Sequence, residues 1–140
     1  MLLLMGFAVP LIIYGTFFYR IYMFNCLVKN ACQHGAAQLD LAKATAEVNN
    51  YLTSHAFVGI TVSIPATVSV VTRTTTYNQV GVGNQNYDNY YLQVSANSQV
   101  APLIPMPSFF GTSIPGMSGP LPLNMTTQSY FENQQALAPP

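Results

Sequence analysis

The first charged side chain of this chain is Arg20, and the nineteen residues before it, MLLLMGFAVPLIIYGTFFY, are mostly apolar. A transmembrane helix needs about 20 such residues, whereas a secretory signal has a basic region followed by about 7–15 apolar residues. No basic residue precedes this apolar stretch, which continues past Arg20 to Val28. We therefore expect an uncleaved helix that lies in a bilayer or packs among copies of itself.

The composition narrows the classes of function. Charged residues make up 6% of the chain, against about a quarter in a typical soluble protein, and the formal net charge is zero. This balance offers no basic patch to nucleic acid. The acidic residues are scattered, and the sequence holds no nucleophile motif and no phosphate-binding loop. We expect neither an enzyme nor a cofactor, and the neutral polar second part suits an extracellular surface.

The helical pattern extends beyond the apolar start. Residues 21–51 lack proline and are rich in good helix formers, with apolar residues recurring near the helical period. Gly35 is the one weak point, at a cost of about 1 kcal/mol relative to alanine. The sequence therefore predicts one helix of roughly fifty residues, about 75 Å long. We divide it into an apolar half, 1–28, and an amphipathic half, 29–55.

The remaining residues, 56–140, have the composition of a β-domain. Four segments rich in Val, Ile, Thr and Tyr read as strands, namely AFVGITVSI, ATVSVVTRTTTY, NYYLQVSANSQV and PLNMTTQSYF. Pro65 stands as a break or an edge position between the first two. VGVGNQNYDN reads as a loop, and a Pro/Gly-rich loop covers 101–122, with Phe109 and Phe110 expected to pack on a surface. We predict an α+β fold in which the long helix packs on a small antiparallel sheet.

Two stretches carry a resemblance to a known family. FAVPLIIYG followed by NACQHGAAQLDLA resembles the TadE-like pseudopilins of the tight-adherence pilus, within the type IV pilin superfamily. The family has an Asn-Ala-Ala-Arg-x-Gly-Ala stretch, which is matched here by Asn30, Ala31, Gly35 and Ala36, with Cys32 and Gln33 in place of the usual Ala and Arg. The strand and Pro-rich turn YYLQVSANSQVAPLIPMP and the segment LPLNMTTQSYFEN are also similar. The resemblance implies a pilin-like fold.

The chain departs from the family in two respects. The residues before Phe7 include neither a basic leader nor the glutamate that in pilins is thought to pair with a neighbour's amino terminus. Their absence puts that pairing device in doubt. Gly6-Phe7 nevertheless resembles a prepilin peptidase junction.

The resemblance implies a structural subunit of an extracellular type IV pilus-like filament at the cell surface. Its partners would be its own copies, the cytoplasmic membrane before assembly, and the pilus assembly machinery. Pro10 would free the carbonyl of Gly6 and bend or melt the helix there. We expect an assembly core made by Leu2, Leu3, Leu4, Phe7, Pro10, Leu11, Ile12, Tyr14, Phe17, Phe18, Ile21 and Phe24.

Two alternatives stay open. The chain could be a minor, membrane-resident pseudopilin that primes or tips a pilus. It could instead be a single-span membrane-anchored binding module whose β-domain holds a ligand near Phe109. The abundance of the chain in surface appendages would separate these alternatives from the filament subunit.

Single residues add further hypotheses. Arg20 would form an ion pair with Asp40 or Glu47 of a staggered neighbour, since an unpaired arginine in a filament core would be costly. Asn124-Met125-Thr126 is an N-glycosylation sequon. Cys26 and Cys32 lie about 240° apart around one helix, so no internal disulfide is expected. His34 and His55 have no neighbouring cluster of carboxylates or cysteines, so we expect no metal site.

Overall fold

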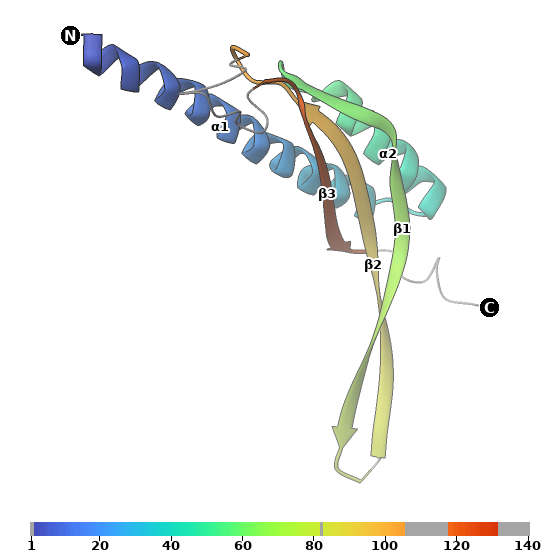
Figure 1. The fold of residues 1–140 in the computed structure, drawn as a ribbon. Helices are drawn as coiled ribbons and strands as arrows, with labels where there is room; N and C mark the ends of the chain where they lie inside the picture. The colour runs from blue at the N-terminus through green and yellow to red at the C-terminus, as the bar shows by residue number, and fades with distance from the viewer. Residues whose placement is uncertain (1, 82, 106–117, 132–140) are drawn as a thin grey trace.

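The computed structural model describes residues 2–81, 83–105 and 118–131, and it has an α+β fold. Its elements are α1 (Leu2–Ala36), α2 (Leu41–Ser54), β1 (Ile60–Gln79), β2 (Gly83–Val100) and β3 (Leu121–Tyr130). The strands form an antiparallel sheet in the order β1-β2-β3. Both helices pack on one face of this sheet, α1 across β2 and β3 and α2 against β1 (Figure 1).

The prediction of one helix of about fifty residues is wrong. α1 ends at Ala36 and α2 begins at Leu41. Asp40 is the N-cap of α2, where its Oδ1 accepts a hydrogen bond from the Lys43 backbone N–H at 2.7 Å. An aspartate at this position satisfies one of the N–H groups that a helix start leaves without a partner. The break lets α2 turn back and lay its buried residues, Ala44, Val48 and Leu52, on the core.

Gly35 lies where α1, α2 and β2 meet. A Cβ atom built there would lie 2.6 Å from Cγ2 of Val48, 2.9 Å from Cδ2 of Leu92 and 3.3 Å from the carbonyl oxygen of Ala44. The absence of a side chain therefore lets the two helices and the sheet approach one another closely. What reads in the sequence as a weak point of the helix is a packing contact in the fold.

The first two predicted strand segments join into one continuous strand, which begins at Ile60 and not at Ala56. β1 runs through a cis Ile64-Pro65 peptide bond, and its pairing with β2 shifts register between Ser63 and Thr67. Because β1 is an edge strand of the sheet, the missing N–H of Pro65 is tolerated. The predicted loop VGVGNQNYDN is also shorter than expected, since pairing continues up to Gln79 and Gly83.

This pairing produces a two-stranded projection, which we call the β-arm and define as residues 72–90. Tyr130, near the end of β3, pairs with Tyr91, which pairs in turn with Val71. Beyond that level, from the pair Thr72↔Tyr90 to the pair Gln79↔Gly83, β1 and β2 have no third strand among the described residues. Figure 1 shows the arm leaving the body at the end of the molecule opposite the start of α1.

The core lies between the helices and the inner face of the sheet. Alternate residues of β2 point into the core, and α1 and α2 pack against them. The members with no exposed surface are Phe24, Ala31, Ala44, Val48, Leu52, Leu92, Val94, Ala96, Val100 and Phe131. The helix predicted to be amphipathic in its second half therefore does bury one face on the sheet. Phe109 and Phe110, in the predicted loop, lie outside the described residues.

Candidate assembly surface

α1 has an inner face that its own chain buries. Buried side chains recur every three or four residues, as expected for one face of a helix: Ile13, Phe17, Phe24, Leu27, Val28, Ala31, Cys32 and Ala36. α1 also runs through Pro10 without ending there. The position of this face decides which apolar side chains remain available to a neighbour.

The opposite, outer face of α1 is apolar over its first part and polar afterwards. Five large apolar or aromatic side chains on this face are between 59% and 76% exposed: Leu11, Ile12, Phe18, Tyr19 and Tyr22. Val9 is also exposed, but its helical spacing places it on the row of Ile13 and Phe17. From Asn25 onward the exposed side chains of α1 are polar, namely Asn25, Lys29, Asn30, Gln33 and His34. We call the first five residues, from Leu11 to Tyr22, the outer apolar face; it spans about 17 Å along the helix.

The predicted assembly core divides between the two faces. Leu11, Ile12 and Phe18 lie on the outer apolar face. Pro10, Tyr14 and Ile21 are half-buried, and Phe17 and Phe24 are buried by their own chain. In this conformation Phe17 and Phe24 are therefore not available to a neighbour. The side chains of the four remaining predicted core residues, Leu2, Leu3, Leu4 and Phe7, lie outside the described residues.

Tyr19 and Tyr22 were left out of the predicted assembly core. Tyr19 lies seven positions after Ile12 and Tyr22 four positions after Phe18, so helical spacing would have grouped them. The first half of the helix is apolar on all sides, however, and spacing alone does not tell which side faces the sheet. The polar residues from Asn25 to His34 mark the outer side and are the signal that could have found it.

Arg20 is held by its own chain. Its Nη1 donates a hydrogen bond to the carbonyl oxygen of Ala101 at 2.5 Å, and its guanidinium lies directly against Gly59. Gly59 has a φ of +84°, a conformation that favours glycine. Arg20 also borders a cavity of about 230 Å³ with otherwise mostly apolar walls, made by Thr16, Tyr19, Met23, Phe57, Val58, Ile60 and Leu103.

The predicted ion pair of Arg20 with a neighbouring chain stays a prediction. Of its two proposed partners, Asp40 already caps α2 and lies 3.5 Å from the Nζ of Lys43. Glu47 is half-buried on α2. The guanidinium keeps further N–H donors beyond the one that Ala101 accepts, so Arg20 is able to bind a second acceptor.

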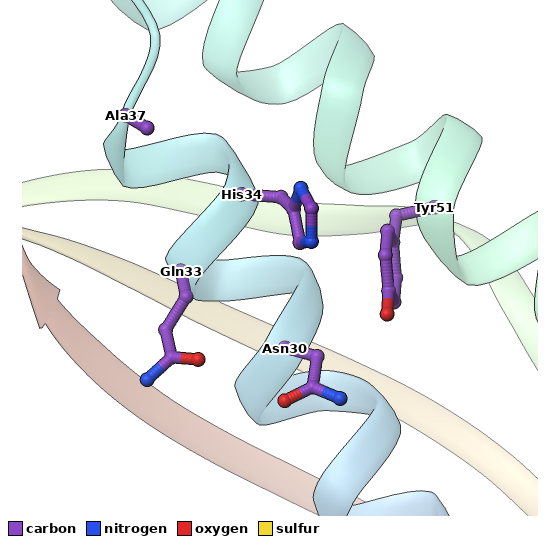
Figure 2. Close-up of a pocket in the computed structure, with 5 residues that line it drawn as sticks. All are labelled: Asn30, Gln33, His34, Ala37 and Tyr51. Atoms are coloured by element: carbon purple, nitrogen blue, oxygen red, sulfur yellow. The ribbon is translucent and has the colours of Figure 1, made fainter.

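A second hollow lies between the two helices, with a volume of about 440 Å³ (Figure 2). Asn30, Gln33, His34 and Ala37 line it from the α1 side and Tyr51 from α2. The ring of His34 stacks on Tyr51 with centroids 4.6 Å apart, and Tyr51 stacks on His55 at 4.1 Å. The His34–Tyr51 contact ties α2 to α1, whereas His55 is the C-cap of α2. No group of three or more metal-ligating side chains occurs in the part of the chain that the structure describes.

Asn124, the predicted glycosylation site, is exposed on the outer face of β3. Its Nδ2 donates hydrogen bonds to Asn97 Oδ1 at 2.7 Å and to Ser95 Oγ at 3.2 Å. The hydroxyl of Thr126, the third residue of the sequon, lies 3.5 Å from Asn124 Oδ1. Attachment of a glycan would replace one of the two Nδ2 hydrogens, so these hydrogen bonds compete with modification.

Both cysteines are free thiols. Cys32 is buried, with its Sγ 3.4 Å from the carbonyl oxygen of Leu92, and Cys26 is half-buried.

Helix α1 is long and apolar enough to cross a membrane over Ala8–Ala36.

No family model matches this chain, and no match was found among curated proteins or solved structures.

Proposed function

We propose that this chain is the structural subunit of an extracellular pilus-like filament, held together by bundling of its amino-terminal helices. The observation that carries the proposal is the outer apolar face of α1. Large apolar side chains are exposed there, while the inner face of the same helix is buried and the rest of the outer face is polar. Such a contiguous exposed patch is typical of a surface that binds protein or lipid.

The energetics favour burial of this face. Moving a large apolar side chain out of water stabilises a protein by about 1.5–3 kcal/mol, so a dispersed molecule in water would be strongly disfavoured. Lipid satisfies the same side chains equally well, because acyl chains are as apolar as leucine. We infer a membrane pool before assembly, and a filament fixed by packing between helices once the assembly machinery has lifted the subunit out of the bilayer.

Isolated surface appendages test the proposal. Filaments sheared from cells would be examined by electron microscopy, and their subunits identified by mass spectrometry. We expect this chain to be the abundant repeating component. Trace amounts would instead indicate the minor pseudopilin that primes or tips a pilus, and absence from appendages would indicate the membrane-anchored binding module.

A matched pair of variants tests the surface itself. Phe18→Glu places a charge in the middle of the outer apolar face, whereas Gln33→Glu places the same charge on the exposed polar part of the same helix. We expect Phe18→Glu to abolish filaments and Gln33→Glu to leave them. Neither side chain is buried, so both variants should fold in detergent. Normal filaments from Phe18→Glu would contradict the proposal.

A further inference from the structure

The β-arm is a regular element without a core of its own. None of its described side chains is buried. Hydrogen bonds between side chains cross from one strand to the other: Thr74 donates to Asp88 Oδ1 at 2.6 Å and Thr76 to Asn86 Oδ1 at 2.8 Å. Tyr77 and Tyr87 form an edge-to-face pair with ring centroids 5.8 Å apart. Two-stranded hairpins are marginally stable by themselves in water. Pairing with a further strand would therefore stabilise the β-arm.

Among the described residues, no strand pairs with the outer edge of β3. β3 is the last strand of the sheet, and the Phe131 backbone N–H donates to the carbonyl oxygen of Tyr90 at 3.0 Å. Backbone groups alternate in direction along an antiparallel ladder. The N–H groups of Asn124, Thr126, Gln128 and Tyr130 consequently point away from β2, toward the free edge. Pro122 follows the same alternation, so its missing N–H would also face that edge.

Natural edge strands are usually protected by charges, bulges or covering segments. β3 contains no charged residue, and its pairing with β2 has no register shift. Pro122, next to its start, is the one protective residue in the strand. Within the part of the chain that the structure describes, the edge from Asn124 to Tyr130 thus has unpaired backbone groups and no charge or bulge that would repel another strand.

The free edge of β3 and the β-arm carry side chains of the same types. On the outer face, hydrogen bonds run across the strands and end at β3: Gln128 Nε2 donates to Gln93 Oε1 at 2.6 Å, and Asn124 donates to Asn97. The arm carries the same residue types, Thr, Asn, Gln and Tyr, with Arg73 and Asp88 both near its base. Asn and Gln side chains form ladders readily when strands are added. The eight-residue arm strands, 72–79 and 83–90, also fit the ten residues of β3.

We infer that the β-arm of one copy adds to the free edge of β3 in the next copy, which extends the sheet from subunit to subunit; this inference rests on the proposed filament. The two surfaces differ, so the contact is heterologous. Heterologous contacts that do not close into a ring generate open filaments. The arm projects from the body at the end opposite the start of α1, whereas β3 runs along the body (Figure 1).

Two variants test the contact. Gln128→Pro removes an N–H that faces the free edge and leaves the β2–β3 hydrogen bonds intact; Gln128→Thr, its matched control, loses the same side-chain contacts but keeps the N–H. A shortened arm lacks the paired residues 74–77 and 85–88, which preserves strand phase and the turn. We expect Gln128→Pro and the shortened arm to lower the yield of sheared filaments by about tenfold or more, and Gln128→Thr to have little effect.

Circular dichroism and thermal unfolding of each chain in mild detergent show whether it folds. If Gln128→Pro fails to fold, the shortened arm decides, because its deletion lies outside the core. Wild-type yields of filament from a folded shortened arm would overturn the inference and leave the proposed function intact. Absence of filaments from the wild-type chain as well would overturn the proposed function and, with it, this inference.

Discussion

Gly35 shows how one missing side chain sets the distance between α1, α2 and β2. We predict that Gly35→Ala lowers the free energy of unfolding by about 1–3 kcal/mol, because the new methyl group would overlap Val48 and press on a backbone carbonyl. Gly15→Ala, in the same helix, is the control, since a Cβ there has no neighbour within 4 Å. It should be neutral or stabilise by up to about 1 kcal/mol. Chemical denaturation in mild detergent measures both.

Equal effects of the two alanines would contradict this account of Gly35. Propensity alone predicts that both substitutions stabilise the helix, because alanine is the better helix former at either site. Opposite signs at Gly15 and Gly35 can therefore come only from packing.

Asp40 makes a second residue-scale prediction, which concerns pH. The backbone N–H of Lys43, which donates to its carboxylate, holds the pKa of Asp40 below its usual value. A carboxyl whose pKa is lowered on folding stabilises the folded state above the unfolded pKa, about 3.9, and this contribution is lost as pH falls through the folded-state pKa. The difference in Tm between wild type and Asp40→Asn should therefore shrink on acidification.

Asp40→Ala serves as the reference for the cap itself. Asparagine accepts the Lys43 N–H without a charge, whereas alanine cannot accept it. At neutral pH we expect Asp40→Ala to lower Tm by a few degrees and Asp40→Asn by less. A Tm difference between wild type and Asp40→Asn that stays constant down to about pH 2.5 would exclude the lowered pKa as its cause.

At the scale of elements, the sequence predicts whether a segment is a helix or a strand better than it predicts where that element begins and ends. Composition identifies the apolar helix and the strand segments, because β-branched residues and a continuous apolar run are local signals. The helix break was missed. Gly35 acquires its role only when α2 folds back, whereas Asp40 caps α2 through a local hydrogen bond from Lys43, and this N-cap signal was overlooked. Pro65 was read as a break or an edge position; it lies within the edge strand β1, where the pairing with β2 shifts register between Ser63 and Thr67. The candidate surface was predicted in part, at Leu11, Ile12 and Phe18.

Arg20 links elements that lie far apart in the sequence. From α1, its side chain contacts Ala101, just after β2, and Gly59, just before β1. We predict that Arg20→Met, which keeps an aliphatic stem but loses the donors, lowers the free energy of unfolding by about 1.5–3 kcal/mol. Lys29→Met removes an exposed cation from the same helix and should cost little. Denaturation of both variants in detergent tests this. If Arg20→Met is as stable as the wild type but forms no filaments, Arg20 would instead belong to the contact between subunits.

At the scale of the whole molecule, the low charge content predicts how the proposed filament would dissociate. The outer apolar face carries no charge, and β3 carries none either. Raising the salt concentration to about 1 M reduces the screening length to about 3 Å, which weakens ion pairs but leaves apolar burial in place. We therefore expect purified filaments to stay intact in concentrated salt and to dissociate in detergent, which replaces the neighbouring helices around α1. Sedimentation followed by electron microscopy measures both. Filaments that come apart in salt alone would show that ion pairs, with Arg20 the first to examine, hold the subunits together instead of the outer apolar face.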